Sequence, residues 1–109
     1  MCQNRTRPTE LRSRLAVSML TISSRVVVAE TAVFRELEGE AVLLNLDTGM
    51  YFGLNEVGTR MWRLMEQHGQ LDAVRDAIVG EFDVNASTAE RDLLALVAAL
   101  REKGLVQVA

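Results

Sequence analysis

The chain holds very few of the side chains on which most enzymes and metal sites rely. Among its 109 residues there is a single histidine, His68, and a single cysteine, Cys2, which lies next to the amino terminus. A catalytic triad, a Cys–His pair, a zinc site or an internal disulfide needs more of these residues, or needs them together. No glycine-rich phosphate loop is present either. We therefore predict that the protein is not an enzyme, uses no cofactor or metal, and resides in the reducing cytoplasm.

Long apolar runs and a strong positive charge are also missing. No stretch approaches the roughly 20 apolar residues that span a bilayer, so we expect no membrane partner. The net charge is −3, but residues 1–25 hold five of the 12 basic residues and only one of the 15 acidic residues. The remainder of the chain is therefore acidic and repels phosphate, which argues against nucleic acid as a partner.

The basic head, residues 1–24, is predicted to be a flexible arm, followed by one folded domain over residues 25–109. The head has no periodic apolar pattern, and its longest apolar run, Leu15-Ala16-Val17, is too short for the core of a signal peptide. A targeting segment is therefore the weaker interpretation. A further alternative is that Met19 is the natural start and that residues 1–18 are an extension.

Two short segments with period-two patterning predict a β-hairpin. In Ala41–Leu46, Val42, Leu44 and Leu46 share one face, with Leu43 and Asn45 on the other. In Met50–Leu54, Tyr51 points away from Met50, Phe52 and Leu54. The loop between them, Asp47-Thr48-Gly49, has glycine at the position that requires a left-handed backbone. Arg25–Ala29 is a further candidate strand, because it is rich in β-branched residues. Thr31–Leu37 fits either a strand or a loop, and it precedes a turn at Glu38-Gly39-Glu40.

Three apolar stripes at helical spacing follow the hairpin. Asn55 is a good N-cap for a first helix that begins at Glu56 and ends at Gly69. A second stripe runs from Leu71 to Phe82. The third helix is predicted to start at a capping box, Ser87-Thr88-Ala89-Glu90, and to end at Lys103 with Gly104 as its C′ residue, after which Leu105–Val108 could pack back as a short strand. This order indicates an α+β domain whose helices cover one face of a small antiparallel sheet.

Features that could mark a ligand site have simpler explanations. The acids Glu36, Glu38 and Glu40 could hold a metal, but such clusters usually solvate a turn. His68 suits the negative end of a helix. Trp62 is expected in the core rather than as a stacking platform.

The hairpin and the start of the first helix resemble a known family. The stretch Leu44–Asn55, followed by Val57-Gly58 and Met61-Trp62, is similar to the PqqD family, whose fold is the RiPP recognition element. Glu81–Val84 and Leu100–Val106 extend the resemblance, which covers about residues 24–106. It implies a winged helix-turn-helix-like domain, with an N-terminal antiparallel three-stranded sheet followed by three helices and without enzyme activity.

Members of this family capture the leader segment of a ribosomally made precursor peptide and present it to a modifying enzyme. The free-standing form accompanies lasso-peptide systems, where the partner is a leader peptidase. It also serves in pyrroloquinoline quinone synthesis, where the partner is a radical enzyme. The implied partners are therefore a leader peptide and one enzyme of its pathway, and we favour the lasso pathway.

The resemblance also implies where the peptide lies, namely as an added strand between Met50–Leu54 and the third helix. An edge strand offers free backbone N–H and C=O groups for such pairing. The predicted contacts are Met50, Tyr51, Phe52 and Gly53 on the strand and Arg91, Leu94, Ala98 and Arg101 on the helix, where they share one stripe beside the core stripe of Leu93, Leu96, Val97 and Leu100. Ordinary core packing is an equal alternative for Leu94, and the two arginines contact either leader acids or solvent.

Two other functions fit the same order of elements. A DNA-binding winged helix needs several basic residues on its recognition helix, whereas residues 87–103 balance their basic residues with as many acidic ones. A structural or toxin-like oligomer subunit would pair its edge strand with itself. We expect a monomer or a weak dimer, and light scattering would separate these cases.

Because the head carries no periodic apolar pattern, we expect it to be dispensable. A variant that starts at Met19 should keep both its thermal midpoint and its affinity for a leader peptide. A clear loss of either would show that residues 1–18 pack on the domain or take part in binding.

Overall fold

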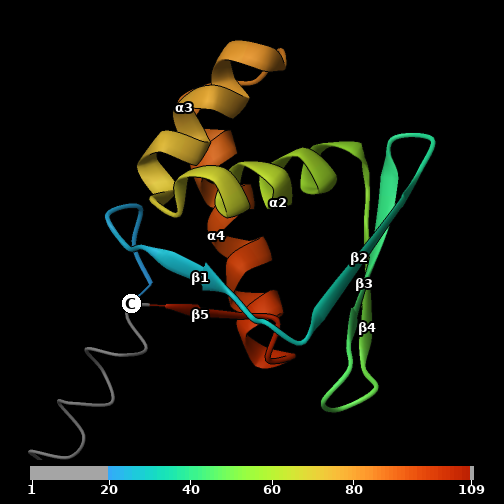
Figure 1. Ribbon diagram of the computed structural model, residues 1–109. Coiled ribbons are helices and arrows are strands. Elements are labelled where there is room, and N and C mark those ends of the chain that lie inside the picture. The colour runs from blue at the N-terminus through green and yellow to red at the C-terminus, as the bar shows by residue number, and fades with distance from the viewer. Residues whose placement is uncertain (1–19, 109) are drawn as a thin grey trace, which may run out of the picture.

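The computed structural model describes residues 20–108 (Figure 1). Residues 1–18, which we expect to be dispensable, lie outside this range. The elements follow one another in the order expected for the PqqD-like fold, with strands first and three helices after them. They are β1 (Val26–Val28), β2 (Ala32–Leu37), β3 (Glu40–Asn45), β4 (Tyr51–Leu54), α2 (Glu56–His68), α3 (Leu71–Glu81), α4 (Ala86–Glu102) and β5 (Val106–Val108). The α+β prediction, with a three-stranded antiparallel sheet and three helices, is confirmed.

The three-stranded sheet has the order β2-β3-β4, so that β3 is central and β4 lies at an edge. α2 packs on one face of this sheet and also contacts α3 and α4 on its other side (Figure 1). The segment Thr31–Leu37, which fitted either a strand or a loop, is largely strand because β3 pairs with it along its length. The C-terminal tail forms β5, which pairs antiparallel with β1.

Backbone conformation explains both tight turns of the sheet. Gly49 has φ +78° in the loop before β4, which confirms the left-handed position predicted there. Between β2 and β3, Glu38 and Gly39 have φ +55° and +85°. Two successive residues with positive φ match the right-handed twist of the strands that they connect.

Side-chain caps place the ends of the helices. The Asn55 side chain accepts a hydrogen bond from the Gly58 N–H at 2.8 Å, and Gly69 closes α2 with φ +75°. The predicted start of α4 at Ser87 is wrong, because Asn85 is the N-cap and accepts from the Thr88 N–H at 2.8 Å. Asparagine caps as well as serine does, and the earlier cap gives the helix two more residues.

The core lies between the sheet and the helices and centres on Trp62, whose side chain is 1% exposed. Its ring stacks on Phe34 of β2 with centroids 6.5 Å apart, and the guanidinium of Arg63 lies 4.3 Å from the Phe34 ring on the surface. On β3 the inward face is that of Leu43 and Asn45, whereas Val42 faces outward. The prediction of Trp62 as a core residue is confirmed.

The folded domain begins earlier than residue 25. Leu20 and Ile22, which we assigned to the arm, are half-buried and pack against the core. The carbonyl of Ser24 accepts a hydrogen bond from the Leu71 N–H at 3.1 Å, at the start of α3. None of the helices within residues 20–108 is long and apolar enough to cross a membrane.

We expect Trp62→Ala to destabilise the domain by about 3–5 kcal/mol, because it leaves a large cavity between α2 and the sheet. The measurement is the free energy of unfolding from denaturant titration. His68→Ala, at the exposed end of the same helix, is the control and should change that free energy by less than about 0.5 kcal/mol. Equal effects of the two substitutions would contradict the central place of Trp62.

Candidate functional site

The register of the sheet shows which backbone groups β4 leaves free. Leu43 pairs with Phe52 and Leu44 with Tyr51, and the Asn45 N–H donates to the Met50 carbonyl at 2.8 Å. In an antiparallel pair, hydrogen-bonded and non-hydrogen-bonded positions alternate. Phe52 and Leu54 therefore direct their N–H and C=O groups towards β3, whereas Tyr51 and Gly53 direct theirs outward from the sheet.

This edge has none of the usual protection against pairing with another strand. Natural edge strands are commonly blunted by charged residues, proline or bulges. The segment Met50–Leu54 has no charged residue and no proline, and its pairing with β3 runs without a bulge. Tyr51 is 71% exposed, so its outward groups are open to a partner strand.

A cavity of about 480 Å³ lies beyond the end of β4, between α2, α3 and α4. Its walls are mainly apolar, with two carboxylates, Asp83 and Asp92, among the lining residues. Those residues are Asn55, Val57, Gly58, Met61, Ile78, Phe82, Asp83, Val84, Ala89, Asp92 and Leu96. Asn55 directly follows β4, so a chain running along the β4 edge would reach this cavity. The cavity suits an apolar side chain with a neutral or basic neighbour.

The structure brings the strand part of the predicted site to this edge. Tyr51, Phe52 and Gly53 belong to β4, and Met50 directly precedes it. Tyr51 and Gly53 lie on the outer face of the sheet, while the half-buried Phe52 packs against the core. Tyr51 and Gly53 thus have outward backbone groups, whereas Met50 and Phe52 hold the strand to β3.

The structure places the helical part of the predicted site on another flank of α4. In a helix, neighbouring residues are turned by roughly 100°, so Asp92 and Leu94 lie on opposite sides of the buried Leu93. The cavity beside β4 is lined by Ala89, Asp92 and Leu96 of α4. The predicted stripe Arg91, Leu94, Ala98 and Arg101 therefore lies on the far side of the core stripe from this cavity.

Asn45 is a polar residue of this region that sequence reasoning passed over. It is 3% exposed, and its Nδ2 donates to the carbonyl of Lys103 at 2.9 Å. Its Oδ1 accepts from the Asp47 N–H at 2.9 Å and from the Thr31 hydroxyl at 3.2 Å. Asn45 thus ties the β3–β4 loop to the C-terminal end of α4. The sequence did hold a signal for this buried role, because Asn45 lies on the same strand face as Leu43, and that face is buried.

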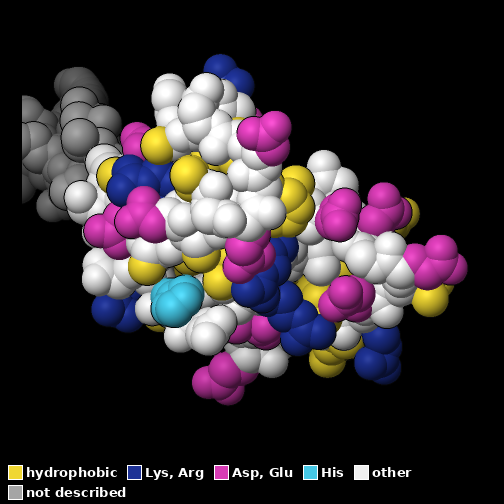
Figure 2. Space-filling model, turned by 90° about the horizontal axis from the view of Figure 1, so that it is seen from above, with side chains coloured by type: hydrophobic (Ala, Val, Ile, Leu, Met, Phe, Trp, Pro, Cys, Tyr) yellow, Lys and Arg dark blue, Asp and Glu magenta, His cyan; other side chains and the backbone are white. Residues whose placement is uncertain are grey.

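Ion pairs on the surface of the helices do not mark a site. Arg60 donates two hydrogen bonds to Glu81, at 2.7 and 2.8 Å, and this contact lowers the pKa of the Glu81 carboxyl below its ordinary value. Both side chains are substantially exposed, so the pair contributes little to stability. On the face shown in Figure 2, the basic side chains lie next to acidic ones.

Comparison with known proteins identifies the family. The model of the family described as coenzyme PQQ synthesis protein D (PqqD) matches residues 40–106, more than half of the chain. The chain belongs to the PqqD family. The match spans β3, β4, α2, α3 and α4, which are the elements that form the edge and the cavity. No curated protein sequence matches the chain.

Two solved structures are similar to this PqqD-family chain. One is TbiB1 in complex with the TbiA(beta) leader peptide, with 40% identity and a TM-score of 0.68 over 72% of this chain and 92% of the other. The second is lasso peptide synthetase B1 complexed with the leader peptide, with 24% identity and a TM-score of 0.67 over 75% of this chain and 96% of the other. At that identity the second likeness supports the fold alone.

We expect Asn45→Ala to cost about 2–4 kcal/mol, since it removes three part-buried hydrogen bonds that the buried Asn45 side chain makes. Thr31→Val removes only the longest of the three bonds and should cost about 1 kcal/mol. Denaturant titration of both variants measures the difference. If they lose equal stability, the bonds of Asn45 to Lys103 and Asp47 contribute nothing beyond its bond to Thr31.

Proposed function

We propose that this PqqD-family protein is a non-catalytic adaptor, which captures the leader segment of a ribosomally synthesised precursor peptide and presents it to an enzyme of the same pathway. The observation that carries this proposal is the uncharged, unprotected edge of β4, with outward backbone groups at Tyr51 and Gly53. The family match and the 40%-identical structure with a bound leader peptide support it.

The peptide would bind by β-strand addition. Its backbone would exchange hydrogen bonds with Tyr51 and Gly53, and its side chains would alternate between the two faces of the enlarged sheet. On the helix side they would approach the flank of α4 formed by Asp92 and Leu96, because this flank lines the cavity at the end of β4. We therefore propose these two residues in place of the stripe Arg91, Leu94, Ala98 and Arg101.

The pathway that this adaptor serves is lasso-peptide biosynthesis, with a leader peptidase as the partner enzyme. The 40%-identical structure is described as a leader-peptide complex and covers 72% of this chain, which supports a leader peptide as the ligand. The second candidate is a peptide chaperone in pyrroloquinoline quinone synthesis, which the description of the matching family favours.

The β4 register predicts opposite outcomes for proline at two adjacent positions. Tyr51→Pro removes an outward N–H, so the domain should fold but bind the leader of its precursor at least about tenfold more weakly. Phe52→Pro removes a bond to β3 and should cost roughly 2–4 kcal/mol of stability. Calorimetry with the synthetic leader, and thermal melting, measure the two effects.

Tyr51→Ala is the matched control, because it keeps the backbone N–H and should retain most of the affinity. The core segment of the precursor should not bind to any variant, and no variant should alter the peptide covalently. Unchanged leader affinity in Tyr51→Pro would exclude the β4 edge as the binding site.

A pair of helix substitutions distinguishes the two flanks of α4. Leu94 and Leu96 are both half-buried and both pack against the core, so their replacement by glutamate should destabilise the domain to a similar degree. Leu96→Glu should weaken leader binding by about tenfold or more, since it places a charge beside Asp92 in the cavity. Leu94→Glu should leave the affinity nearly unchanged, and the reverse order would restore the stripe predicted from the sequence.

A further inference from the structure

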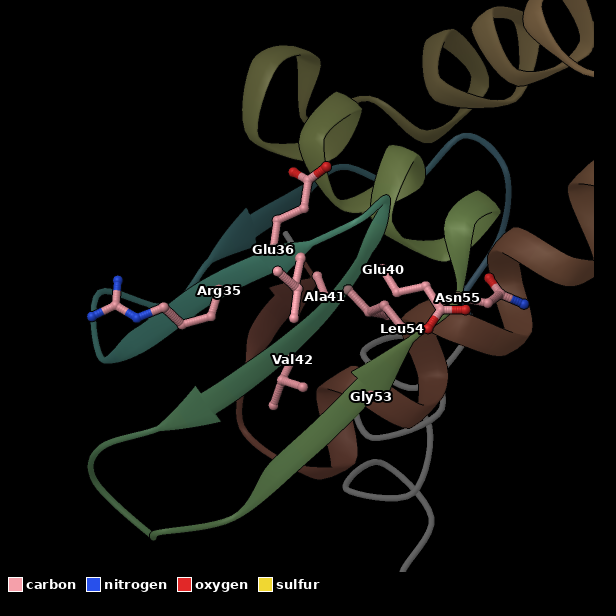
Figure 3. Close-up of a pocket in the computed structure, with 9 residues that line it drawn as sticks. Arg35, Glu36, Glu40, Ala41, Val42, Gly53, Leu54 and Asn55 are labelled. Carbon is pink, nitrogen blue, oxygen red and sulfur yellow. The ribbon is translucent and has the colours of Figure 1, made fainter.

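A hollow of about 670 Å³ lies against the outer face of the sheet and extends to Asn55, the N-cap of α2. Its lining comes from β2, β3 and β4, and Val42 projects from β3 beside Gly53 of β4 (Figure 3). Val42 is 46% exposed, because its partner in the ladder, Gly53, has no side chain to cover it. The hollow therefore exists where one side chain is missing from an otherwise complete sheet face.

Nothing within the described part of the chain requires a glycine at position 53. Its φ lies outside the left-handed region that favours glycine, and a Cβ built there meets no atom within 4 Å. A glycine in a strand weakens that strand, and such a position often marks the close approach of a ligand or another backbone. The natural explanation of Gly53 is therefore a partner that approaches this face.

The register shows which atom of a partner would come closest. Val42 and Gly53 form a non-hydrogen-bonded pair, so their side-chain positions lie near each other. A strand added to the free edge would place one of its residues directly opposite Gly53, with its side chain on the same outer face. Since Gly53 has no side chain, that residue can lean across it and cover Val42.

We propose that this hollow is a specificity site for one large apolar or aromatic side chain, supplied by the peptide residue that pairs with Gly53. This inference rests on the proposed strand addition, and it adds a second recognition surface on the face opposite to α4. Val42 offers an apolar floor, and Arg35 at the rim can stack a guanidinium on an aromatic ring. The rim acid Glu40, on the same strand face as Val42, disfavours an acidic side chain there.

The test uses a display library of random 20-residue linear peptides, selected on the immobilised full chain. The peptides that bind should share an aromatic or large aliphatic residue at one position. Replacing that residue by alanine should weaken binding to the unmodified protein by about tenfold. The same replacement should have little effect on binding to Gly53→Val, in which the valine already fills the hollow.

Two further variants serve as controls. Gly80→Ala adds a side chain to another exposed glycine with open space, but on α3, and should leave the effect of the peptide alanine substitution unchanged. Val42→Thr keeps the shape of the floor while making it polar, so it tests the hollow even if Gly53→Val folds poorly. In Val42→Thr, replacing the shared peptide residue by alanine should weaken binding by clearly less than tenfold.

The outcomes separate this inference from the proposed function. If selected peptides lose affinity for Tyr51→Pro but show no coupling to Gly53 or Val42, the adaptor function holds and the specificity site is overturned. If the library gives no linear peptide that binds, both are overturned.

Discussion

The geometry of the candidate site depends on one buried side chain, Asn45. The last carbonyls of a helix have no partner within the helix, and the Lys103 carbonyl at the end of α4 receives the Asn45 Nδ2 donor. The same carboxamide accepts the Asp47 N–H and so fixes the loop before β4. Gly104 makes this approach possible, since a Cβ there would lie 3.0 Å from Asn45 Nδ2 and its φ is +72°. One side chain thus sets how the β4 edge stands relative to α4.

Because residues alternate in direction along a strand, the residues of β4 fall into two groups with different roles. Phe52 and Leu54 direct their backbone groups towards β3 and their side chains towards the core, so they hold the strand in place. Tyr51 and Gly53 direct their backbone groups outward and their side-chain positions to the outer face. A strand with this division can add a partner without losing any hydrogen bond of its own hairpin. The domain can therefore bind an extended peptide with little rearrangement.

The parts of the fold that follow from local chemistry could be predicted from the sequence. Three such features are the left-handed Gly49, the N-cap Asn55 and the left-handed Gly104 after α4. Each depends only on the backbone conformation or hydrogen bonding of a few neighbouring residues. Ser87 was a plausible cap, but Asn85 competes for the same role two residues earlier, and sequence alone does not rank them. Leu20 and Ile22 were missed because two isolated apolar residues show no period.

The flank of α4 that faces the sheet could not be predicted in the same way. Helical spacing shows which residues share a stripe, yet two stripes border the core stripe symmetrically. The choice between them depends on how α4 docks, and the contacts that decide it are distant in sequence. Glu90 pairs with Arg75 of α3 at 2.9 Å on one flank, and the Lys103 carbonyl receives Asn45 towards the other.

Selectivity in strand addition cannot come from the backbone, since every residue except proline offers the same N–H and C=O groups. It has to come from side chains, and a strand presents these alternately to two faces. The domain offers a different surface to each set, with an apolar cavity near α4 and an open hollow over Gly53. Residues of one peptide that differ by a single position would then meet unlike environments. A shift of register by one residue would exchange the two sets, so the two surfaces together specify the register as well as the sequence of the bound strand.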